Sequence, residues 1–273
     1  MMSDPPAPVG DGSILVDSHA HLELEPLVND VDAVVKRAAE AGVAAIITVG
    51  IDLDDVQRAL EIADRFEQVF ASVGFHPHNA KEVSEAALHE MEQSAAHPKV
   101  VGYGEIGLDF FRNLSPQSVQ KAVFHEQLFL AKSLGRPVVI HLRNAYEQGL
   151  TMLEQAAPFP AGGVIHCFSG NEQDAERAIA LGFHISIPGT ITYKKNEKLR
   201  SIVKSLPADR LLVETDCPFL SPEPRRGKTN EPANILYTAR KVAEVRIVSL
   251  DEVARTTTRN AIRLFHLPGH LFE

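Results

Sequence analysis

The sequence predicts an α/β fold, a TIM (β/α)8 barrel that forms a single domain. Three observations indicate it: the length of 273 residues, the alternation of short apolar runs with longer helical patterns, and the polar residues that end those runs. The chain exceeds the usual domain size, but α/β barrels commonly have about 250 residues in one domain. Apolar residues make up 44% of the chain and charged residues 23%, as in an ordinary folded globular protein.

Eight runs rich in Val and Ile are the predicted parallel strands. They are residues 14–21, 44–50, 69–77, 100–108, 137–143, 163–169, 183–189 and 210–216. Eight is the number of strands that closes a TIM barrel. A doubly wound open sheet has similar βα units, but it gathers its ligands at one switch point, whereas polar residues end strands throughout this chain. The closed barrel is therefore favoured.

The segments between the runs have apolar residues at helical spacing, which indicates crossover helices. Segments 28–42 and 115–135 are examples, and each ends in a Gly where a helix C-cap is expected. Segment 221–235, rich in Pro and Arg, departs from the pattern and is predicted to be an ordered loop over the barrel mouth. We expect residues 1–12 to be a loose leader and residues 13–273 to form the barrel.

The charge and the cysteines limit the classes of function. The formal net charge of −9 argues against nonspecific coating of duplex nucleic acid. It does not exclude a nucleic-acid substrate, because metal ions and local cations at a site outweigh a distant field. Cys167 and Cys217 are too few for a disulfide framework, and strand alternation directs both away from the expected site, so they are predicted to be buried structural thiols.

Signals for other compartments or for assembly are missing from the sequence. The N-terminal stretch has neither the basic start nor the apolar run of a signal peptide, so a cytoplasmic protein is expected. Apolar stretches are too short to predict a membrane span. Nothing in the sequence indicates an obligate protein partner.

Two histidines at the end of the first predicted strand are the first candidate metal ligands. His19 and His21 lie two residues apart, and the period of two in a strand directs both side chains to the same side. Both can therefore bind one metal ion. Asp17 shares their face and is expected to support the site rather than to bind the metal.

Four further polar residues end predicted strands. Glu105 lies in GEIGLD, where a buried carboxylate needs a cation or hydrogen-bond donors. His141 and His166 end the fifth and sixth strands, and Asp216 ends the eighth. With the histidine pair, these residues form a mixed His and carboxylate set that suits two divalent ions. Glu214 is in register with Asp216 and either supports the site or has a structural role.

Residues near the same strand ends are candidates for substrate contact. His76 and His78, after the third predicted strand, are predicted to contact substrate, with additional metal ligation as the alternative. Arg143 follows His141 by two residues, and its planar cation suits a phosphate oxygen. Other residues in the predicted loops after strands four, seven and eight bind substrate or are solvated surface charges. They are Arg112, Tyr193, Lys194, Lys195, Arg225, Arg226 and Lys228, of which Tyr193, Lys194 and Arg226 are the preferred substrate-binding residues.

Seven motifs, in order, closely resemble those of the TatD family of metal-dependent deoxyribonucleases. They are DSHAHLE, GFHPH, GEIGLD, IHLRNA, HCFSG, ETDCPFLSP and RRGKTNEPANI, and they cover nearly the whole chain. The resemblance implies a barrel of the amidohydrolase superfamily that binds two divalent ions, Mg²⁺, Mn²⁺ or Zn²⁺. The implied ligands are His19, His21, Glu105, His141, His166 and Asp216. Glu105 would bridge both ions, in place of the carboxylated lysine that related barrels often use.

The resemblance also implies 3′–5′ exonuclease action on DNA or short oligonucleotides. Glu105 and Asp216 are the predicted catalytic residues, with Asp216 accepting the proton of the attacking water. The ligand set alone also suits a metal-dependent amide, ester or lactone hydrolase, and a non-catalytic barrel that binds a partner is a third interpretation. The chain has no Trp, so stacking of unpaired bases would use residues such as Phe75, Phe110, Phe111, Phe168 or Tyr193.

Overall fold

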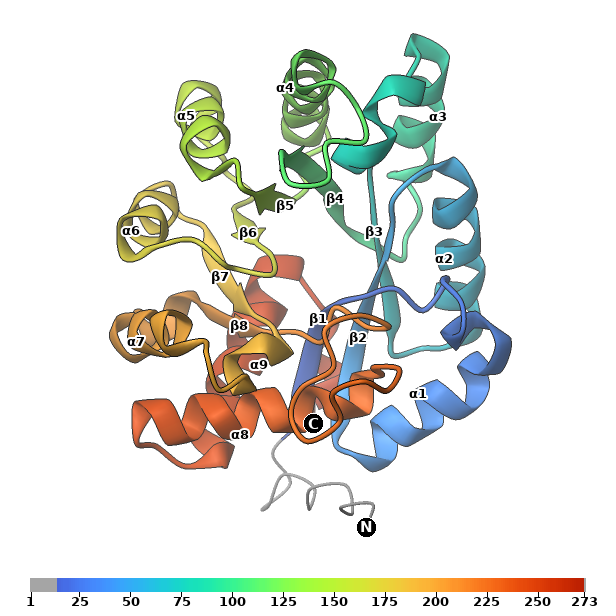
Figure 1. Ribbon diagram of the computed structural model, residues 1–273. Helices are drawn as coiled ribbons and strands as arrows, with labels where there is room; N and C mark the ends of the chain where they lie inside the picture. Colours follow the sequence, from blue (N-terminus) through green and yellow to red (C-terminus); the bar gives the residue numbers. More distant parts are fainter. Residues whose placement is uncertain (1–13, 273) are drawn as a thin grey trace. The chain divides into compact units, whose positions relative to one another are not determined.

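The computed structural model describes residues 14–272, so the leader predicted for residues 1–12 lies outside the described residues. Strands and helices alternate along the described chain (Figure 1). The strands are β1 (Leu15–Ala20), β2 (Val43–Gly50), β3 (Val69–Val73), β4 (Val100–Asp109), β5 (Val138–Arg143), β6 (Gly163–Ile165), β7 (His184–Ile187) and β8 (Leu211–Val213). The α-helices are α1 (Val31–Glu40), α2 (Leu53–Arg65), α3 (Glu85–Ser94), α4 (Gln117–Ser133), α5 (Tyr146–Ala156), α6 (Glu172–Ala180), α7 (Glu197–Ser205), α8 (Ile235–Arg246) and α9 (Leu250–Phe265).

The eight strands form one sheet in which sequence neighbours are also spatial neighbours, from β1 through β8. The segment that follows β8 also pairs with β1, through a parallel bridge between Ala20 and Cys217. A sheet whose first strand meets the end of its last is a closed barrel. The predicted (β/α)8 barrel is therefore confirmed. Within residues 14–272, every helix is too short or too polar to cross a membrane.

Residue contacts divide the chain into two compact units, and one of them is residues 48–185. Its strands pair in parallel from β3 to β7. All residues of β4 are buried, and α4 packs against this strand with Phe124 and Leu128 in the core. This matches the continuous apolar runs expected of a parallel sheet that is covered by helices.

The strand β4 is irregular on both sides of Glu105. The register between β4 and β5 shifts between Tyr103 and Ile106. Gly104 and Gly107 have φ of 146° and 145°, and a Cβ atom at either position would lie 2.2 Å or less from a carbonyl oxygen of β5. Only glycine suits both the backbone angle and this close approach. The glycines of the GEIG sequence therefore permit a bulge, a device that redirects a side chain out of simple strand alternation.

The second unit comprises residues 14–47 and 186–272, and a buried clamp joins its two ends. The Asp17 carboxylate accepts hydrogen bonds from the Thr215 backbone N–H at 2.9 Å and from the Thr215 hydroxyl at 2.6 Å. Next to this clamp, the Asp216 N–H donates to the His19 carbonyl and the His21 N–H donates to the Cys217 carbonyl. The histidine pair of β1 is thereby aligned with the residues that follow β8.

Most predicted boundaries agree with the structure, and the differences have a local cause. Gly42 and Gly135 follow α1 and α4 with positive φ, as predicted for C-caps. Strands β3 and β7 end earlier than predicted, at Val73 and Ile187, and 3-10 helices begin soon after them, at Pro77 and Gly189. Strands β6 and β8 also end earlier, and the chain soon turns left-handed at Cys167 (φ 46°) and Asp216 (φ 55°). The loop predicted for residues 221–235 ends sooner, since a 3-10 helix begins at Pro232 and α8 begins at Ile235.

Candidate metal centres

The first candidate metal centre consists of His19, His21 and Asp216, three residues of one unit. The Nε2 atoms of the two histidines lie 3.3 Å apart. The Asp216 Oδ1 atom lies 3.6 Å from the Nε2 of His21 and 3.9 Å from that of His19. Two donors bound to one ion at about 2.0–2.1 Å are about 3.0–3.4 Å apart. The three ligand atoms thus converge at the spacing that a divalent ion requires, with only small adjustment at Asp216.

A carboxylate that sequence reasoning overlooked fixes the orientation of His21. The Glu23 Oε1 atom lies 3.0 Å from the Nδ1 of His21, and both side chains are buried. The Nδ1–H group therefore donates to the carboxylate, which leaves the lone pair of Nε2 available for a metal. The sequence contains the signal, because Glu23 continues the alternation of His19 and His21.

The second candidate metal centre surrounds Glu105 in the other unit. The Glu105 Oε1 atom lies 2.6 Å from His141 Nδ1, 2.8 Å from His166 Nε2 and 3.4 Å from His76 Nε2. His141 Nδ1 and His166 Nε2 are 3.3 Å apart. Burial alone would raise the pKa of Glu105, but the three histidines together hold it well below its ordinary value. The carboxylate is therefore ionised and suited to bind a cation.

Asp109 supports the second centre and was also overlooked in the sequence. One carboxylate oxygen lies 2.9 Å from His78 Nε2 and 3.3 Å from His141 Nε2. The other oxygen accepts the backbone N–H groups of Phe111 and Arg112. Burial raises the pKa of Asp109, but the hydrogen bonds from His141 and His78 outweigh it, so the pKa falls below its ordinary value. Asp109 thus holds the His141 Nδ1 atom toward Glu105.

The two histidines predicted to contact substrate differ in their surroundings. The Nδ1 atom of His76 accepts the backbone N–H of His78 at 3.1 Å, so the proton of the neutral ring is on Nε2 and points to Glu105. Burial lowers the pKa of His76 to about 4, which keeps the ring neutral near pH 7. His76 is therefore a donor to Glu105 rather than a free ligand. His78 is partly exposed and contacts Asp109.

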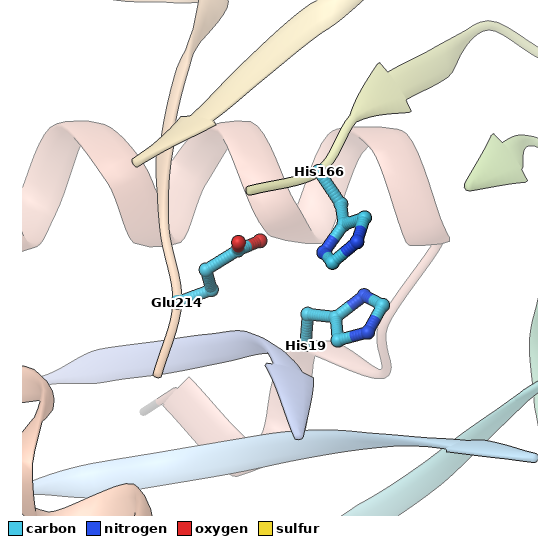
Figure 2. Close-up of side chains that lie close together, drawn as sticks. All are labelled: His19, His166 and Glu214. Atoms are coloured by element: carbon cyan, nitrogen blue, oxygen red, sulfur yellow. The ribbon is translucent and has the colours of Figure 1, made fainter. Parts of the chain in front are cut away.

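Figure 2 shows three side chains: His19 on β1, His166 just after β6, and Glu214 on the segment after β8. Glu214 is fully buried. Cys217 is fully buried too, and burial raises the pKa of its thiol. Cys167 is only half-buried, and its left-handed backbone means that the strand alternation used to place it does not apply.

The predicted substrate cations lie at the end of β5 or in loops, and two of them are held over aromatic rings. The Arg143 guanidinium lies 4.1 Å from the centre of the Phe111 ring, within one unit. In the other unit, Arg226 lies 4.5 Å from the centre of the Tyr193 ring. Such contacts restrict the orientation of a guanidinium while leaving its N–H groups available. The remaining predicted cations Arg112, Lys194, Lys195 and Lys228 are exposed, and Arg225 is half-buried.

The loop after β8 is ordered by its own hydrogen bonds. The side-chain N–H groups of Asn230, which is fully buried, donate to the carbonyls of Thr215 and Phe219 at 2.9 Å and 2.7 Å. The Asn230 amide oxygen accepts the side-chain N–H of Asn234. The Tyr193 hydroxyl donates to the Ser221 carbonyl at 3.0 Å, which joins this loop to the one after β7.

Comparison with known proteins gives consistent results over most of the chain. Residues 16–266 match the family model of TatD-related DNases. The uncharacterized metal-dependent hydrolase YabD of Bacillus subtilis is 40% identical over 254 residues, which cover 93% of this chain and all of that protein. The 3′-5′ ssDNA/RNA exonuclease TatD of Erwinia amylovora is 37% identical over 259 residues, with 93% and 100% coverage.

Comparison with solved structures points to the same family as the sequence relatives do. The crystal structure of the TatD homologue YjjV from Escherichia coli has a TM-score of 0.89 and 34% identity, and the match covers 93% of this chain and 98% of that one. An organophosphorus hydrolase variant from Deinococcus radiodurans, with a TM-score of 0.59 and 13% identity, shares the fold alone. The buried histidine and carboxylate clusters provide the metal-binding groups that such hydrolases need. This chain belongs to the TatD family of metal-dependent hydrolases.

Proposed function

We propose that this hydrolase cleaves phosphodiester bonds in single-stranded DNA and short oligonucleotides, as a 3′–5′ exonuclease. The observation that carries the proposal is that two cations held over aromatic rings belong to segments that also carry candidate metal ligands. Arg143 follows His141 by two residues and is held by Phe111, and Arg226 lies in the loop that begins after Asp216. Cations placed in this way suit a substrate that is an anion along its length.

The donor sets fit divalent ions of intermediate hardness. His19, His21 and Asp216 would hold one ion. Glu105, His141 and His166, whose ligand atoms lie 2.6–3.3 Å from one another, would hold a second. The role of Glu105 as a ligand shared by both ions stays a prediction from the family resemblance. When bound, divalent ions lower the pKa of water and polarise the phosphoryl oxygens.

The remaining chemistry is assigned to side chains of the protein. Asp216 is suited to accept the proton of the attacking water, because its side chain is 13% exposed while that of Glu23 is fully buried. Arg143 offers two N–H groups in one plane to the non-bridging phosphate oxygens. Glu23 and Asp109 keep the rings of His21 and His141 in one tautomer.

The roles of His76 and His78 follow from their hydrogen bonds. His76 donates to Glu105 and so orients that carboxylate, rather than holding substrate. His78 is the more exposed of the two and retains the predicted contact with substrate. Tyr193, Lys194 and Arg226 are assigned to the phosphates beyond the cleaved one, since they lie in two loops that are joined to each other.

The test is an activity assay on purified protein with Mg²⁺, Mn²⁺ or Zn²⁺. The substrates are single-stranded DNA labelled at either end, single-stranded RNA, and panels of esters, lactones and amides. We expect metal-dependent release of nucleotides from the 3′ end. Turnover of an ester, lactone or amide without release of nucleotides would refute the proposal in favour of the carbonyl hydrolase.

A matched pair of variants separates chemistry from folding. Asp216→Asn removes the proposed proton acceptor and one ligand, and we expect it to lower activity at least about 100-fold. Asp209→Asn makes the same change at an exposed aspartate of the same unit and is expected to have wild-type activity. Equal activity in the two variants would contradict the role given to Asp216.

A further inference from the structure

Phe219 is an exposed aromatic residue at the edge of the first candidate metal centre. It is one of the large apolar residues that are exposed among those the structure describes, with 52% of the residue accessible. Its ring centre lies 6.1 Å from that of His21, with the rings inclined by 68°. It follows Asp216 by three residues in the same loop. Phe219 therefore lies next to two proposed metal ligands, His21 and Asp216.

The backbone of Phe219 is fixed although its side chain is exposed. The Phe219 N–H donates to the Asp216 carbonyl at 2.9 Å. The Phe219 carbonyl accepts a hydrogen bond from the buried side chain of Asn230 at 2.7 Å. These bonds fix the point where the ring is attached, and 52% of the residue remains accessible to a partner. A ring on a fixed backbone binds a flat partner with little further loss of backbone entropy.

The aromatic residues suggested by the sequence are less suited to stacking. Phe75 and Phe168 are buried, and Phe110 is half-buried with the Lys121 amine over its ring. Phe111 and Tyr193 each carry a guanidinium over the ring, from Arg143 and Arg226. These two rings are therefore engaged in orienting cations, whereas Phe219 touches the proposed ligand His21 with its ring.

We propose that Phe219 stacks against the base of the nucleotide at the cleaved phosphodiester bond. The inference rests on the proposed nuclease function and specifies its substrate as a strand with an unpaired terminal base. In a nucleotide, one sugar separates the base from the phosphate. A phosphate at His19, His21 and Asp216 therefore brings its base to the edge of that cluster, where Phe219 lies. Stacking is tolerant of sequence because every base has an aromatic face.

The test compares oligonucleotides that differ in one base. The first has normal nucleotides throughout, and the others carry an abasic sugar at the 3′ or the 5′ terminal position. The variants are Phe219→Ala, Phe219→Leu, which keeps apolar bulk, and Phe219→Tyr, which keeps the ring. Phe129→Ala serves as the control, since Phe129 is an even more exposed phenylalanine, on α4.

We expect the wild type to cleave the oligonucleotide with a terminal base faster than its abasic form, by about 5- to 150-fold in kcat/KM. This preference should disappear in Phe219→Ala, shrink in Phe219→Leu, and persist in Phe219→Tyr and Phe129→Ala. Phe219→Ala should leave the abasic substrate nearly unaffected. The proposal is overturned if Phe219→Ala slows both substrates equally or leaves the preference intact.

A binding measurement distinguishes failure of this inference from failure of the proposed function. Fluorescence anisotropy with metal-loaded protein and phosphorothioate oligonucleotides, which resist hydrolysis, reports base recognition without turnover. If the wild type releases no nucleotides, the nuclease proposal fails. The stacking inference then stands only if binding still favours the terminal base through Phe219, and it falls if wild type and Phe219→Ala bind both oligonucleotides alike.

Discussion

Replacing Glu23 tests whether the buried carboxylate beside His21 controls metal binding. The hydrogen bond from His21 Nδ1 to Glu23 Oε1 is 3.0 Å long, and both side chains are at most 5% exposed. A hydrogen bond to a charged group contributes about 1.5–3 kcal/mol, and a neutral one about 0.5–1.5 kcal/mol. Loss of such an outer carboxylate lowers metal affinity about 10- to 100-fold.

These magnitudes predict an order among the variants. Glu23→Ala removes the acceptor and should weaken Mn²⁺ binding about 10- to 100-fold. Glu23→Gln keeps an acceptor oxygen but loses the charge, and should weaken binding by only about 3- to 10-fold. Glu25→Gln makes the same charge change at an exposed position nearby and should bind like the wild type.

The assay is calorimetric titration of chelator-stripped protein with Mn²⁺, with hydrolysis measured over the same range of metal concentration. Both curves should shift together, because the variant changes ligand orientation rather than substrate contact. Thermal unfolding of the metal-free variants establishes that each is folded. If folded Glu23→Ala binds Mn²⁺ as tightly as Glu25→Gln does, Glu23 does not act through His21.

Three other substitutions address the second centre, the substrate and the loop after β8. Glu105→Ala should lose activity together with at least one bound metal, measured by elemental analysis and hydrolysis, and full activity would contradict its role as a ligand. Arg143→Ala should keep its metal content and raise KM for oligonucleotides about 10-fold, as expected for loss of one charge-assisted contact to phosphate; an unchanged KM would exclude Arg143 from the site. Asn230→Ala should lower the free energy of unfolding by about 2–4 kcal/mol in urea titrations, because the Thr215 and Phe219 carbonyls lose a buried donor. A change below about 0.5 kcal/mol would show that water replaces that donor.

The barrel and its strand ends could be predicted because they depend on local patterns. Apolar runs of the right length, helical spacing between them and glycines at helix ends are visible in the sequence alone. The pair His19 and His21 follows from strand alternation, which holds along β1. Glu105 is buried as predicted, whereas the irregular register of β4 around it, with Gly104 and Gly107 close to β5, is not visible in a pattern of alternation.

The partners of the histidines were harder to predict because they depend on contacts and tautomers. Asp109 orients His141 across the pairing of β4 with β5, where a carboxylate and an imidazole lie close only once the register is known. Likewise, His76 and His78 belong to one motif, GFHPH, in which the sequence does not distinguish their roles. The backbone hydrogen bond to His76 Nδ1 makes one ring a donor to Glu105 and leaves the other near Asp109.

The left-handed turns at Cys167 and Asp216 have a consequence for which substitutions the protein accepts. At such an angle a side chain costs roughly 1–2 kcal/mol, glycine costs nothing, and Asn or Asp is tolerated best among the others. Asp is thus among the residues that best tolerate the left-handed angle at position 216, and it also supplies the carboxylate of the first candidate metal centre. At Cys167 the same angle favours Gly or Asn and disfavours Val or Ile, whatever their size. The left-handed backbone therefore limits which amino acids can replace Cys167 and Asp216. A ranking of positions by their distance from the metal ligands alone would not show this limit.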